Sequence, residues 1–283
     1  MIASVAASGP RTQAPPARRS SQVVANRRLG AYALITARDP EGPADPRPGQ
    51  FYMLAAGERW GGGQDERPYL PRAFSFARAR PLGGVGVELD FLLEDVGPGT
   101  HRLAALAPGE ELMLLGPLGV GFDPPAPGTR AVLAGGGIGT APILALHADQ
   151  HGRPPALLGF RSADHARAAE LFHETGGESE APLVVTDDGS AGRQGLVTEP
   201  LRELIDRDAG VTVYACGPPP MLEAVRAQCE DRQVAAQLAL EAGMACGYGA
   251  CFGCVVPTRR GYLRVCVDGP VVDAAALDSA LHP

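Results

Sequence analysis

Four of the six cysteines of this chain stand close together near its C-terminal end. Cys246, Cys251 and Cys254 follow a C-x4-C-x2-C spacing, and Cys266 comes a little later. This is a ligand spacing of [2Fe–2S] clusters held by four thiolates. The intervening residues are mostly glycine and alanine, so the loop can fold tightly round a cluster and aim backbone N–H groups at its sulfides. The cysteines therefore predict a [2Fe–2S] centre, with Cys266 on an alternating strand over 262–269 that closes the site.

Zinc, disulfide bonds and simple burial are the alternatives for these cysteines, and all three stay open. Zinc bound by four cysteines usually takes them from short C-x2–4-C pairs at both ends of the site, whereas the last cysteine here stands alone. Disulfides are favoured in oxidising compartments, and four unrelated buried cysteines are the third possibility. The N-terminal segment lacks the order of basic and apolar residues of an export signal. We therefore expect a cytoplasmic protein, in which clustered cysteines more often hold metal than form disulfides.

A second candidate site is a glycine-rich loop between a predicted strand and a predicted helix. Gly137, Gly139 and Pro142 give G-x-G-x-x-P within "LAGGGIGTAP". Glycines let a pyrophosphate approach the backbone, and free N–H groups at a helix start attract its charge. An isolated turn of this kind is also common between a strand and a helix, but the α/β context favours a dinucleotide site.

A third group, "CGP", follows a later predicted strand, and ligands of open parallel sheets bind at the carboxyl ends of the strands. Cys216 alone is better explained as a buried structural cysteine, although a nicotinamide ring can lie beside it. The candidate NAD-binding residues are Gly135, Gly136, Gly137, Gly139, Thr140, Cys216, Gly217 and Pro218.

The composition describes the protein that must position these groups. With 283 residues, 45% hydrophobic and 20% charged, the chain is long enough for two or three domains with buried cores. The net charge of -7 argues against a nucleic-acid partner and against an anionic membrane surface. The apolar runs fall short of the roughly 20 residues that cross a bilayer. We therefore expect a multi-domain protein without nucleic-acid or membrane partners.

The pattern of elements divides the chain into four parts. Residues 1–21, rich in Ala, Ser, Pro and Arg, are predicted to be a disordered tail, with a targeting signal as the alternative. Short apolar runs between turns predict an antiparallel β-barrel over 22–126. Alternating strands and helices predict a doubly wound, parallel sheet over 127–235, which carries the glycine loop and thus the candidate NAD site. Residues 236–283 form a small [2Fe–2S] domain, which makes the fold class multi-domain β plus α/β. The expected helices of the sheet domain span 140–150, 166–174, 198–208 and 219–230.

Residues of the barrel segment have the types that bind a phosphorylated flavin. Arg72 and Ser75 occur in "PRAFSFA", where an arginine can grip phosphate and a hydroxyl can hydrogen-bond a ring nitrogen. Gly99 and Thr100 in "VGPGT" suit contacts with phosphate. Taken singly, each pair is equally an ordinary strand edge or turn.

The order of these motifs resembles the ferredoxin-reductase superfamily, in which a β-barrel holds the flavin and an α/β domain holds the pyridine nucleotide. The motifs are GQF (49–51), R-x-x-S (72–75), G-T (99–100), GPLG (116–119), GGGIGTAP (135–142) and CGP (216–218). The chain departs from the group at Ala73, where proline is common, and at Glu94, where a basic residue is common. The FAD contacts that the resemblance implies are Arg72, Ala73, Phe74, Ser75, Leu92, Leu93, Glu94, Gly99 and Thr100.

The cysteine segment narrows this resemblance. "LALEAGMACGYGACFGCVVP" followed by "VCVDGPV" is similar to the electron-transfer subunits of dihydroorotate dehydrogenase B. That family implies FAD, a [2Fe–2S] cluster and NAD as exchangeable acceptor. It also implies an FMN-containing catalytic subunit as partner, in a heterotetramer of two of each chain. The expected function is to pass electrons from that subunit through the cluster and FAD to NAD+ in pyrimidine biosynthesis. A flavin suits the middle position because it exchanges both hydride and single electrons.

Two alternative functions stay open at this point. A related FAD/[2Fe–2S] NAD(P)H reductase subunit, acting with ferredoxin, a hydrogenase or in sulfide metabolism, shares every motif. A zinc-stabilised nucleotide-binding regulator without turnover would lack flavin. NAD and NADP are not distinguished, although Arg161 and Ser162 stand where a ribose 2′-phosphate can be read. We predict no general base, nucleophile or carboxylate pair that would oxidise an organic substrate here, and we expect His147 and His151 to be a solvated pair.

Overall fold

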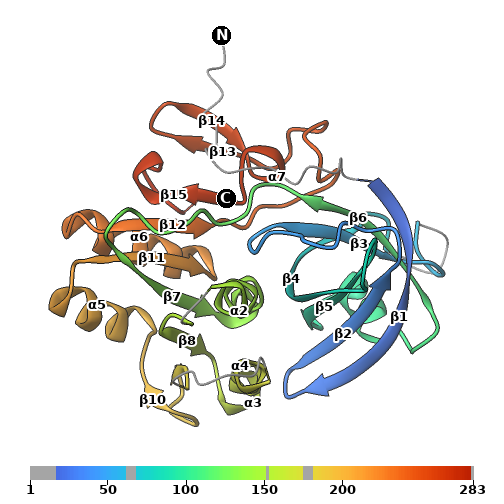
Figure 1. Ribbon diagram of the computed structural model, residues 1–283, viewed down its shortest axis with the longest axis horizontal. Helices are drawn as coiled ribbons and strands as arrows, with labels where there is room; N and C mark the ends of the chain where they lie inside the picture. The colour runs from blue at the N-terminus through green and yellow to red at the C-terminus, as the bar shows by residue number, and fades with distance from the viewer. Residues whose placement is uncertain (1–16, 62–67, 151–152, 175–180, 282–283) are drawn as a thin grey trace.

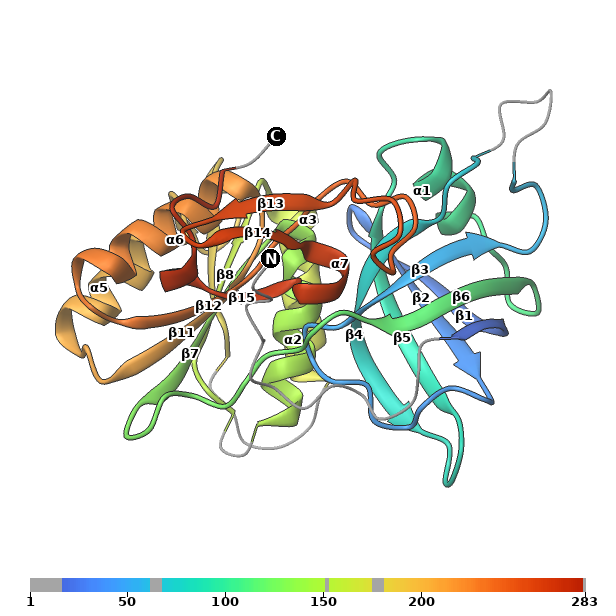
Figure 2. The ribbon, with the colours of Figure 1, turned by 90° about the horizontal axis from the view of Figure 1, so that it is seen from above.

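The computed structural model describes residues 17–61, 68–150, 153–174 and 181–281. A barrel and an open sheet with its helices lie side by side, and the C-terminal segment lies across both (Figures 1 and 2). This arrangement confirms the predicted fold class of a β-barrel joined to an α/β domain. Most of the predicted tail, residues 1–16, lies outside the described residues.

Six antiparallel strands close into a barrel in the order β1-β2-β5-β4-β3-β6. Apolar side chains fill its interior, where Tyr52 meets the rings of Phe76 and Phe91 edge-on at centroid distances of 6.4 and 5.7 Å. Edge-to-face contacts of this kind are favoured by the charge distribution of aromatic rings. The strands are β1 (Ala17–Leu29), β2 (Tyr32–Asp39), β3 (Phe51–Ala56), β4 (Arg72–Pro81), β5 (Val87–Glu94) and β6 (Glu111–Leu118), with helix α1 (Pro98–Ala104) between β5 and β6.

The first strand corrects the predicted domain boundary. The composition places residues 17–21 in the tail, but they belong to β1 and pair with β6. Ser21 is buried, and its hydroxyl donates to the carbonyl oxygen of Leu112 at 2.7 Å. The polar composition of this stretch predicts disorder, whereas pairing with β6 satisfies its backbone groups and makes it a barrel strand.

A seven-stranded sheet forms the second body, in the order β10-β9-β8-β7-β11-β12-β15. Only the last pairing, of β12 with β15, is antiparallel. The interior strand β11 is buried along its whole length, as expected for a parallel sheet covered on both faces. The strands are β7 (Arg130–Gly136), β8 (Ala156–Phe160), β9 (Leu183–Thr186), β10 (Arg193–Gln194), β11 (Val211–Cys216), β12 (Ala235–Ala239) and β15 (Val271–Asp273).

Helices cover both faces of this sheet (Figure 2). Helices α5 and α6 lie on one face, and α2 lies on the other, between the sheet and the barrel. The helix expected over 166–174 is instead split into short turns. The helices are α2 (Thr140–Asp149), α3 (Ala163–Ala166), α4 (Glu170–His173), α5 (Thr198–Arg207) and α6 (Pro219–Asp231), with 3-10 turns η1 (Gly137–Gly139), η2 (Arg167–Ala169) and η3 (Ala274–Ala276).

The C-terminal segment corrects two further expectations. Strand β12 extends the sheet beyond the predicted boundary at residue 235, because its five residues pair with β11. Cys266 lies in the short helix α7 (Val265–Asp268) rather than on a strand. The strand β14 (Gly261–Arg264), which pairs with β13 (Val255–Thr258), ends where the Asp268 carboxylate accepts a hydrogen bond from the Arg264 N–H at 2.9 Å. This side-chain acceptor closes a turn that the alternating apolar pattern does not reveal.

The cysteine segment is packed against the barrel as well as the sheet. Phe51, Met53 and Leu118 of the barrel share one apolar core with Cys254 and Cys266. The loop approaches β3 so closely at Gly247 that an added Cβ would lie 2.5 Å from Cγ of Met53. Gly247 also has a φ of 80°, which favours glycine. Apolar packing thus fixes the cysteine loop beside the barrel strands.

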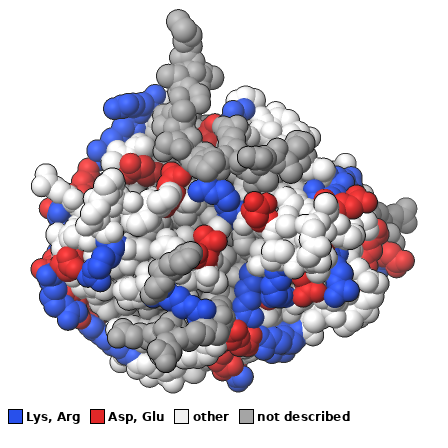
Figure 3. All heavy atoms as spheres, in the orientation of Figure 1, with Lys and Arg blue, Asp and Glu red and all other residues white. Residues whose placement is uncertain are grey.

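Acidic and basic side chains are interspersed over the face drawn in Figure 3. Ion pairs between described residues include Arg38–Glu88 at 3.1 Å and Arg193–Glu203 at 2.8 Å. In the described parts of the chain, none of the helices combines the length and apolar character that crossing a membrane requires.

Candidate redox site

A cavity of about 250 Å3 lies where the barrel, the sheet and the cysteine segment meet. Each body supplies one wall of it. The barrel wall consists of Phe51, Ala73, Phe74, Ser75 and Leu92. The sheet wall consists of Ile138, Gly139, Ala141, Pro142, Cys216 and Ala239. The third wall consists of Leu240, Glu241, Ala242, Met244 and Pro270, most of which lead directly into the first cysteine.

The predicted flavin residues divide between this cavity and its surroundings. Ala73, Phe74, Ser75 and Leu92 line it, with Ser75 opposite Phe51 in the β3–β4 pair. The Leu93 side chain points instead into the barrel core, where it is fully buried. Glu94 lines a neighbouring cavity. Alternation along β5 explains why Leu93 differs from Leu92, because successive side chains of a strand face opposite sides. Glu94 lies on the same side of β5 as Leu92, at the end of the strand.

Arg72 lies directly against the predicted phosphate turn. A Cβ added to Gly99 would stand 2.6 Å from Nε and 2.7 Å from Cζ of Arg72. The guanidinium therefore packs directly against the backbone of Gly99. One of its N–H groups donates to the Leu70 carbonyl oxygen at 2.5 Å, and its Cζ lies 5.8 Å from the centre of the Trp60 ring. A guanidinium has five N–H donors. The geometry of Arg72 and Gly99 therefore fits an anionic phosphate.

Thr100 shapes this turn with its side chain. Its Oγ1 accepts from the N–H groups of Val96 and Gly97 at 2.9 and 3.0 Å, and donates to the Gly97 carbonyl oxygen. The Thr100 hydroxyl is thus engaged within the turn rather than aimed outward. The groups of this turn that are left to bind a phosphate are therefore its backbone and the Arg72 side chain.

A second cavity of about 420 Å3 adjoins the first, since Ile138 and Glu241 line both. Of the predicted NAD residues, Gly136, Gly137 and Pro218 line the second cavity, and Gly139 and Cys216 line the first. Gly135 lies behind them on β7, in register with Cys216 of β11. Parallel pairing of these two strands brings the glycine loop and "CGP" to one edge of the sheet.

The two loops at this edge touch. A Cβ on Gly139 would lie 2.4 Å from the Cys216 carbonyl oxygen and 2.7 Å from the Gly217 nitrogen. Thr140 is fully buried, and its hydroxyl has no hydrogen-bond partner among the described residues. A buried hydroxyl without a partner beside a glycine loop fits a site for a polar ligand. Burial, together with Glu241, raises the pKa of the Cys216 thiol, so this group is neutral at pH 7.

We expect Gly139→Ala to separate these loops. The φ of Gly139 is -62°, which alanine adopts freely, so the effect is steric alone. The clash is with backbone, which cannot rotate aside, and overpacking of this kind costs about 1–3 kcal/mol. Denaturant unfolding should report that loss of stability, and titration with NADH should report weaker binding. Gly243→Ala is the control, because its Cβ would meet no atom within 4 Å. Equal stability of the two variants would contradict the prediction.

Several residues that line the two cavities were not predicted from the sequence, among them Tyr32, Ile138, Glu241 and Met244. Ile138 stands inside the glycine motif, and Glu241 and Met244 stand next to the cysteines, so proximity to a motif was the available signal for these three. Tyr32 follows a turn at the start of β2 and belongs to no motif.

Glu94 anchors an ion pair in the second cavity. Its Oε1 lies 2.8 Å from Nη2 of Arg161 and 3.4 Å from Nε2 of His165. The Ser162 hydroxyl contacts Nδ1 of the same histidine at 2.9 Å. Arg161 and Ser162, the candidates for reading a 2′-phosphate, are thus both engaged within the protein.

The four cysteines come together as two pairs. The sulfur atoms of Cys254 and Cys266 are 3.2 Å apart, and both residues are buried. Cys246 is half-buried and interacts with the thiol of the exposed Cys251. Burial raises the pKa of Cys246, but N–H groups of the loop and that thiol outweigh it and lower the pKa to about 6. Burial and Cys254 raise the pKa of Cys266 to about 12.

Two pairs of cysteines suit a cluster of two irons better than they suit a single metal ion. A structural zinc site requires its four thiolates around one ion, whereas a [2Fe–2S] cluster divides four thiolates between two irons. The donor set therefore fits the cluster.

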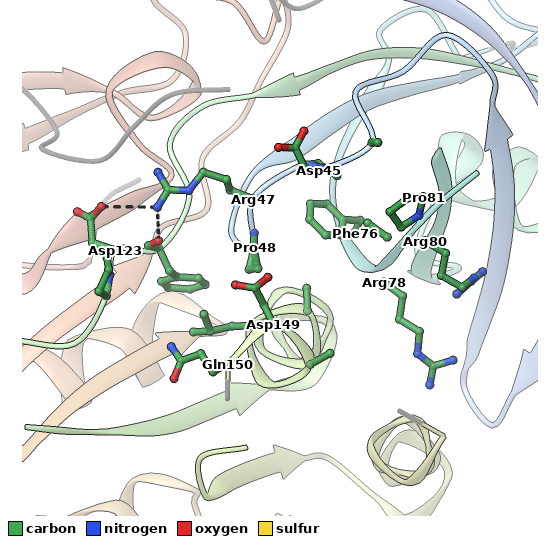
Figure 4. A pocket seen from close by; sticks show the side chains of 18 of the residues that line it. Asp45, Arg47, Pro48, Phe76, Arg78, Arg80, Pro81, Asp123, Asp149 and Gln150 are labelled. Atoms are coloured by element: carbon green, nitrogen blue, oxygen red, sulfur yellow. Dashed lines mark hydrogen bonds and ion pairs between the residues drawn. The ribbon is translucent and has the colours of Figure 1, made fainter. Parts of the chain in front are cut away.

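His147 and a third cavity lie apart from this site. His147 is buried against Phe172, with ring centroids 5.0 Å apart, which corrects the expected solvated pair; His151 lies outside the described residues. Burial and nearby Arg153 lower the pKa of His147. The cavity of about 1050 Å3 in Figure 4 lies between β4 and α2. Its Arg78 and Arg80 are both paired with carboxylates, so an incoming anion would have to displace those partners.

Comparison with known proteins identifies the relatives of this chain. Residues 241–278 match the family model of the iron–sulfur cluster binding domain of dihydroorotate dehydrogenase B. A probable dihydroorotate dehydrogenase B (NAD+) electron transfer subunit of Methanopyrus kandleri is 35% identical, over 89% of this chain and 88% of that protein. The electron transfer subunit of Caldanaerobacter subterraneus subsp. tengcongensis is 34% identical, over 89% of this chain and 94% of its own length.

The structure of an NADH-dependent reduced ferredoxin–NADP oxidoreductase superposes with a TM-score of 0.76 at 22% identity, covering 92% of this chain and 90% of that one, and so shares the fold. The resemblance found in the sequence is confirmed by these matches. This chain therefore belongs to the family of electron transfer subunits of dihydroorotate dehydrogenase B (NAD+), which are oxidoreductase subunits, and it carries that family's iron–sulfur cluster binding domain at its C-terminal end.

Proposed function

We propose that this chain passes electrons from a dihydroorotate-oxidising subunit, through a [2Fe–2S] cluster and FAD, to NAD+ in cytoplasmic pyrimidine biosynthesis. One observation carries the proposal. The cavity between the domains has walls from the barrel, from the glycine loop and "CGP", and from the residues leading to Cys246. Flavin exchanges both hydride and single electrons, nicotinamide exchanges hydride, and the cluster exchanges single electrons. A site that borders all three segments suits the middle carrier.

The residues that would hold FAD are those around this cavity. Arg72 and the backbone of the Gly99–Thr100 turn would bind its phosphates, and Ser75 would contact its ring. The remaining proposed contacts are Ala73, Phe74, Leu92, Leu93 and Glu94, the last two through the β5 backbone because their side chains face elsewhere.

The second cavity is the proposed NAD site. Its proposed contacts are Gly135, Gly136, Gly137, Gly139, Thr140, Cys216, Gly217 and Pro218. Two observations support NAD over NADP. Arg161 is already paired with Glu94, and Asp187 lines the same cavity. An acid near the ribose favours the 2′-hydroxyl of NAD over the 2′-phosphate of NADP.

The exposed surface beside the cysteines is the proposed docking site of the catalytic subunit. Val255 stands opposite Arg264 in the β13–β14 hairpin, so Val255, Arg264 and Tyr262 share one face of it. The Phe252 ring lies 5.6 Å from Cζ of Arg264. Phe252 is 58% exposed and Tyr262 70% exposed, and exposed apolar groups gathered together mark interaction sites. The proposed partner contains FMN, and two copies of each chain form the assembly.

We expect Phe252→Asn to weaken this assembly about tenfold or more, as loss of an aromatic anchor does. Phe252 has a φ of 56°, a left-handed conformation that asparagine tolerates, so the loop should keep its shape. Sedimentation of the two mixed subunits measures the effect. Val85→Asn is the control, since Val85 is 77% exposed on the β4–β5 turn of the barrel. Equal weakening by both variants would argue against a docking role for the cysteine face.

Reconstitution tests the proposal as a whole. The chain is mixed with the FMN subunit of the same organism, and formation of NADH from dihydroorotate and NAD+ is followed at 340 nm. We expect turnover with both chains present and little with either alone. Turnover with ferredoxin as donor, and none with dihydroorotate, would replace this function with that of a related reductase subunit.

A further inference from the structure

Tyr32 occupies an unusual position for a tyrosine of the barrel. It is fully buried at the start of β2, yet it also lines the second cavity, whose other walls come mostly from the sheet domain. Its hydroxyl has no hydrogen-bond partner among the described residues. Leaving a buried hydroxyl unpaired costs free energy that a phenylalanine of the same shape would avoid. A tyrosine here is therefore explained best by a hydrogen-bond partner that a bound ligand supplies to its hydroxyl.

The groups around Tyr32 show where that partner would lie. A Cβ on Gly137 would come within 3.9 Å of the Tyr32 oxygen, the nearest atom to it, so the hydroxyl faces the glycine loop. His165 meets the ring edge-on, with centroids 5.7 Å apart at 82°. Glu94 stands opposite in the strand register, but its carboxylate is engaged by Arg161 at 2.8 Å. The hydroxyl is thus directed at the place where a glycine loop receives a pyrophosphate.

The protonation state of Tyr32 favours an anionic acceptor. Burial and the nearby Glu94 raise the pKa of its hydroxyl well above the ordinary value, so the group keeps its proton. A protonated phenol donates a hydrogen bond, and phosphodiester oxygens can only accept one. Bonds to charged acceptors are also stronger than neutral ones.

We propose that Tyr32 donates a hydrogen bond to a pyrophosphate oxygen of the nicotinamide dinucleotide bound in the second cavity. This inference rests on the proposed function, because it takes that cavity as the NAD site. It adds a contact from the barrel to a site otherwise built by the sheet domain. Binding of the dinucleotide thereby holds the two domains together at Gly137 and Tyr32.

Tyr32→Phe tests this contact, and Tyr52→Phe is a matched control. Tyr52 is also fully buried in the barrel, and its hydroxyl also has no partner among the described residues, but it lines neither of the two cavities of the redox site. Each variant is purified with its cofactors and titrated anaerobically with NADH. We expect binding about tenfold weaker for Tyr32→Phe and unchanged for Tyr52→Phe. Without nucleotide, Tyr32→Phe should melt no lower than the unaltered chain, because only an unpaired hydroxyl is lost.

Fragments of the dinucleotide locate the contact. ADP should lose affinity for Tyr32→Phe by a similar factor to NADH, whereas adenosine should bind both proteins equally. Unchanged NADH binding by Tyr32→Phe, or an equal loss in Tyr52→Phe, would overturn the inference and leave the proposed function intact. Equal losses for ADP and adenosine would overturn the pyrophosphate assignment. Failure of the unaltered chain to bind NADH would instead overturn the proposed function, and this inference with it.

Discussion

Cys266→Ser is expected to lower dihydroorotate-dependent reduction of NAD+ by more than about 100-fold, since loss of even an outer partner of a metal ligand costs 10–100-fold. Cys266 is buried with its sulfur 3.2 Å from that of Cys254, so its loss removes one of two thiolates at the buried end of the site. Iron content should fall with the activity. Reduction of ferricyanide by NADH should persist, because it requires the flavin and the dinucleotide site but not the cluster.

Cys229→Ser is the matched control for this experiment. Cys229 is a thiol of α6 that is 1% exposed, and it belongs to the same apolar core as Cys266. The exchange therefore places the same hydroxyl in an apolar site without touching a proposed ligand. We expect some loss of stability and full iron content. A Cys266→Ser chain that keeps its iron and its dihydroorotate activity would exclude Cys266 as a ligand.

Arg72→Ala is expected to weaken FAD binding about 100-fold, since hydrogen bonds to charged groups contribute about 1.5–3 kcal/mol and a guanidinium can make two to one phosphate. Fluorescence titration of the flavin-free chain with FAD measures this. Arg28→Ala is the control, because Arg28, like Arg72, donates to a backbone carbonyl two residues away, that of Gly30 at 2.7 Å. Arg28 lines neither cavity of the redox site.

Gly99→Ala tests the position of the Arg72 guanidinium while keeping its charge. The added Cβ would meet only the guanidinium within 2.7 Å, and a flexible side chain can move away at little cost. We therefore expect unchanged stability and weaker FAD binding, through displacement of Arg72. Normal FAD affinity in both Arg72→Ala and Gly99→Ala would show that the phosphates bind elsewhere.

The sequence predicted the elements that depend on local patterns. The spacing of Cys246, Cys251 and Cys254 within one glycine-rich loop is local, and the loop does bring Cys246 to Cys251. The strand–loop–helix pattern around Gly137 likewise places the glycine loop at the carboxyl edge of the sheet. Helices expected over 198–208 and 219–230 lie where α5 and α6 do, since periodicity and prolines at helix starts are local signals.

The features that sequence reasoning missed depend on contacts between distant segments. Tyr32 reaches the dinucleotide cavity because the barrel packs against the sheet. The sequence near Tyr32 contains no pattern that predicts this packing. Residues 17–21 are strand because β6 pairs with them. Cys266 is helical because a side chain closes the turn after Arg264. The Leu93 side chain faces away from the flavin cavity because the path of β5 in the closed barrel turns it into the barrel core.

The central claim is that this one chain holds both a flavin and a two-iron cluster. Anaerobic analysis of the purified chain for iron, sulfide, zinc and flavin, together with its visible spectrum before and after NADH, tests this most directly. The account predicts one FAD, two irons and two sulfides per chain, and bleaching of both flavin and cluster absorption by NADH. A colourless chain that contains zinc and lacks flavin would contradict it.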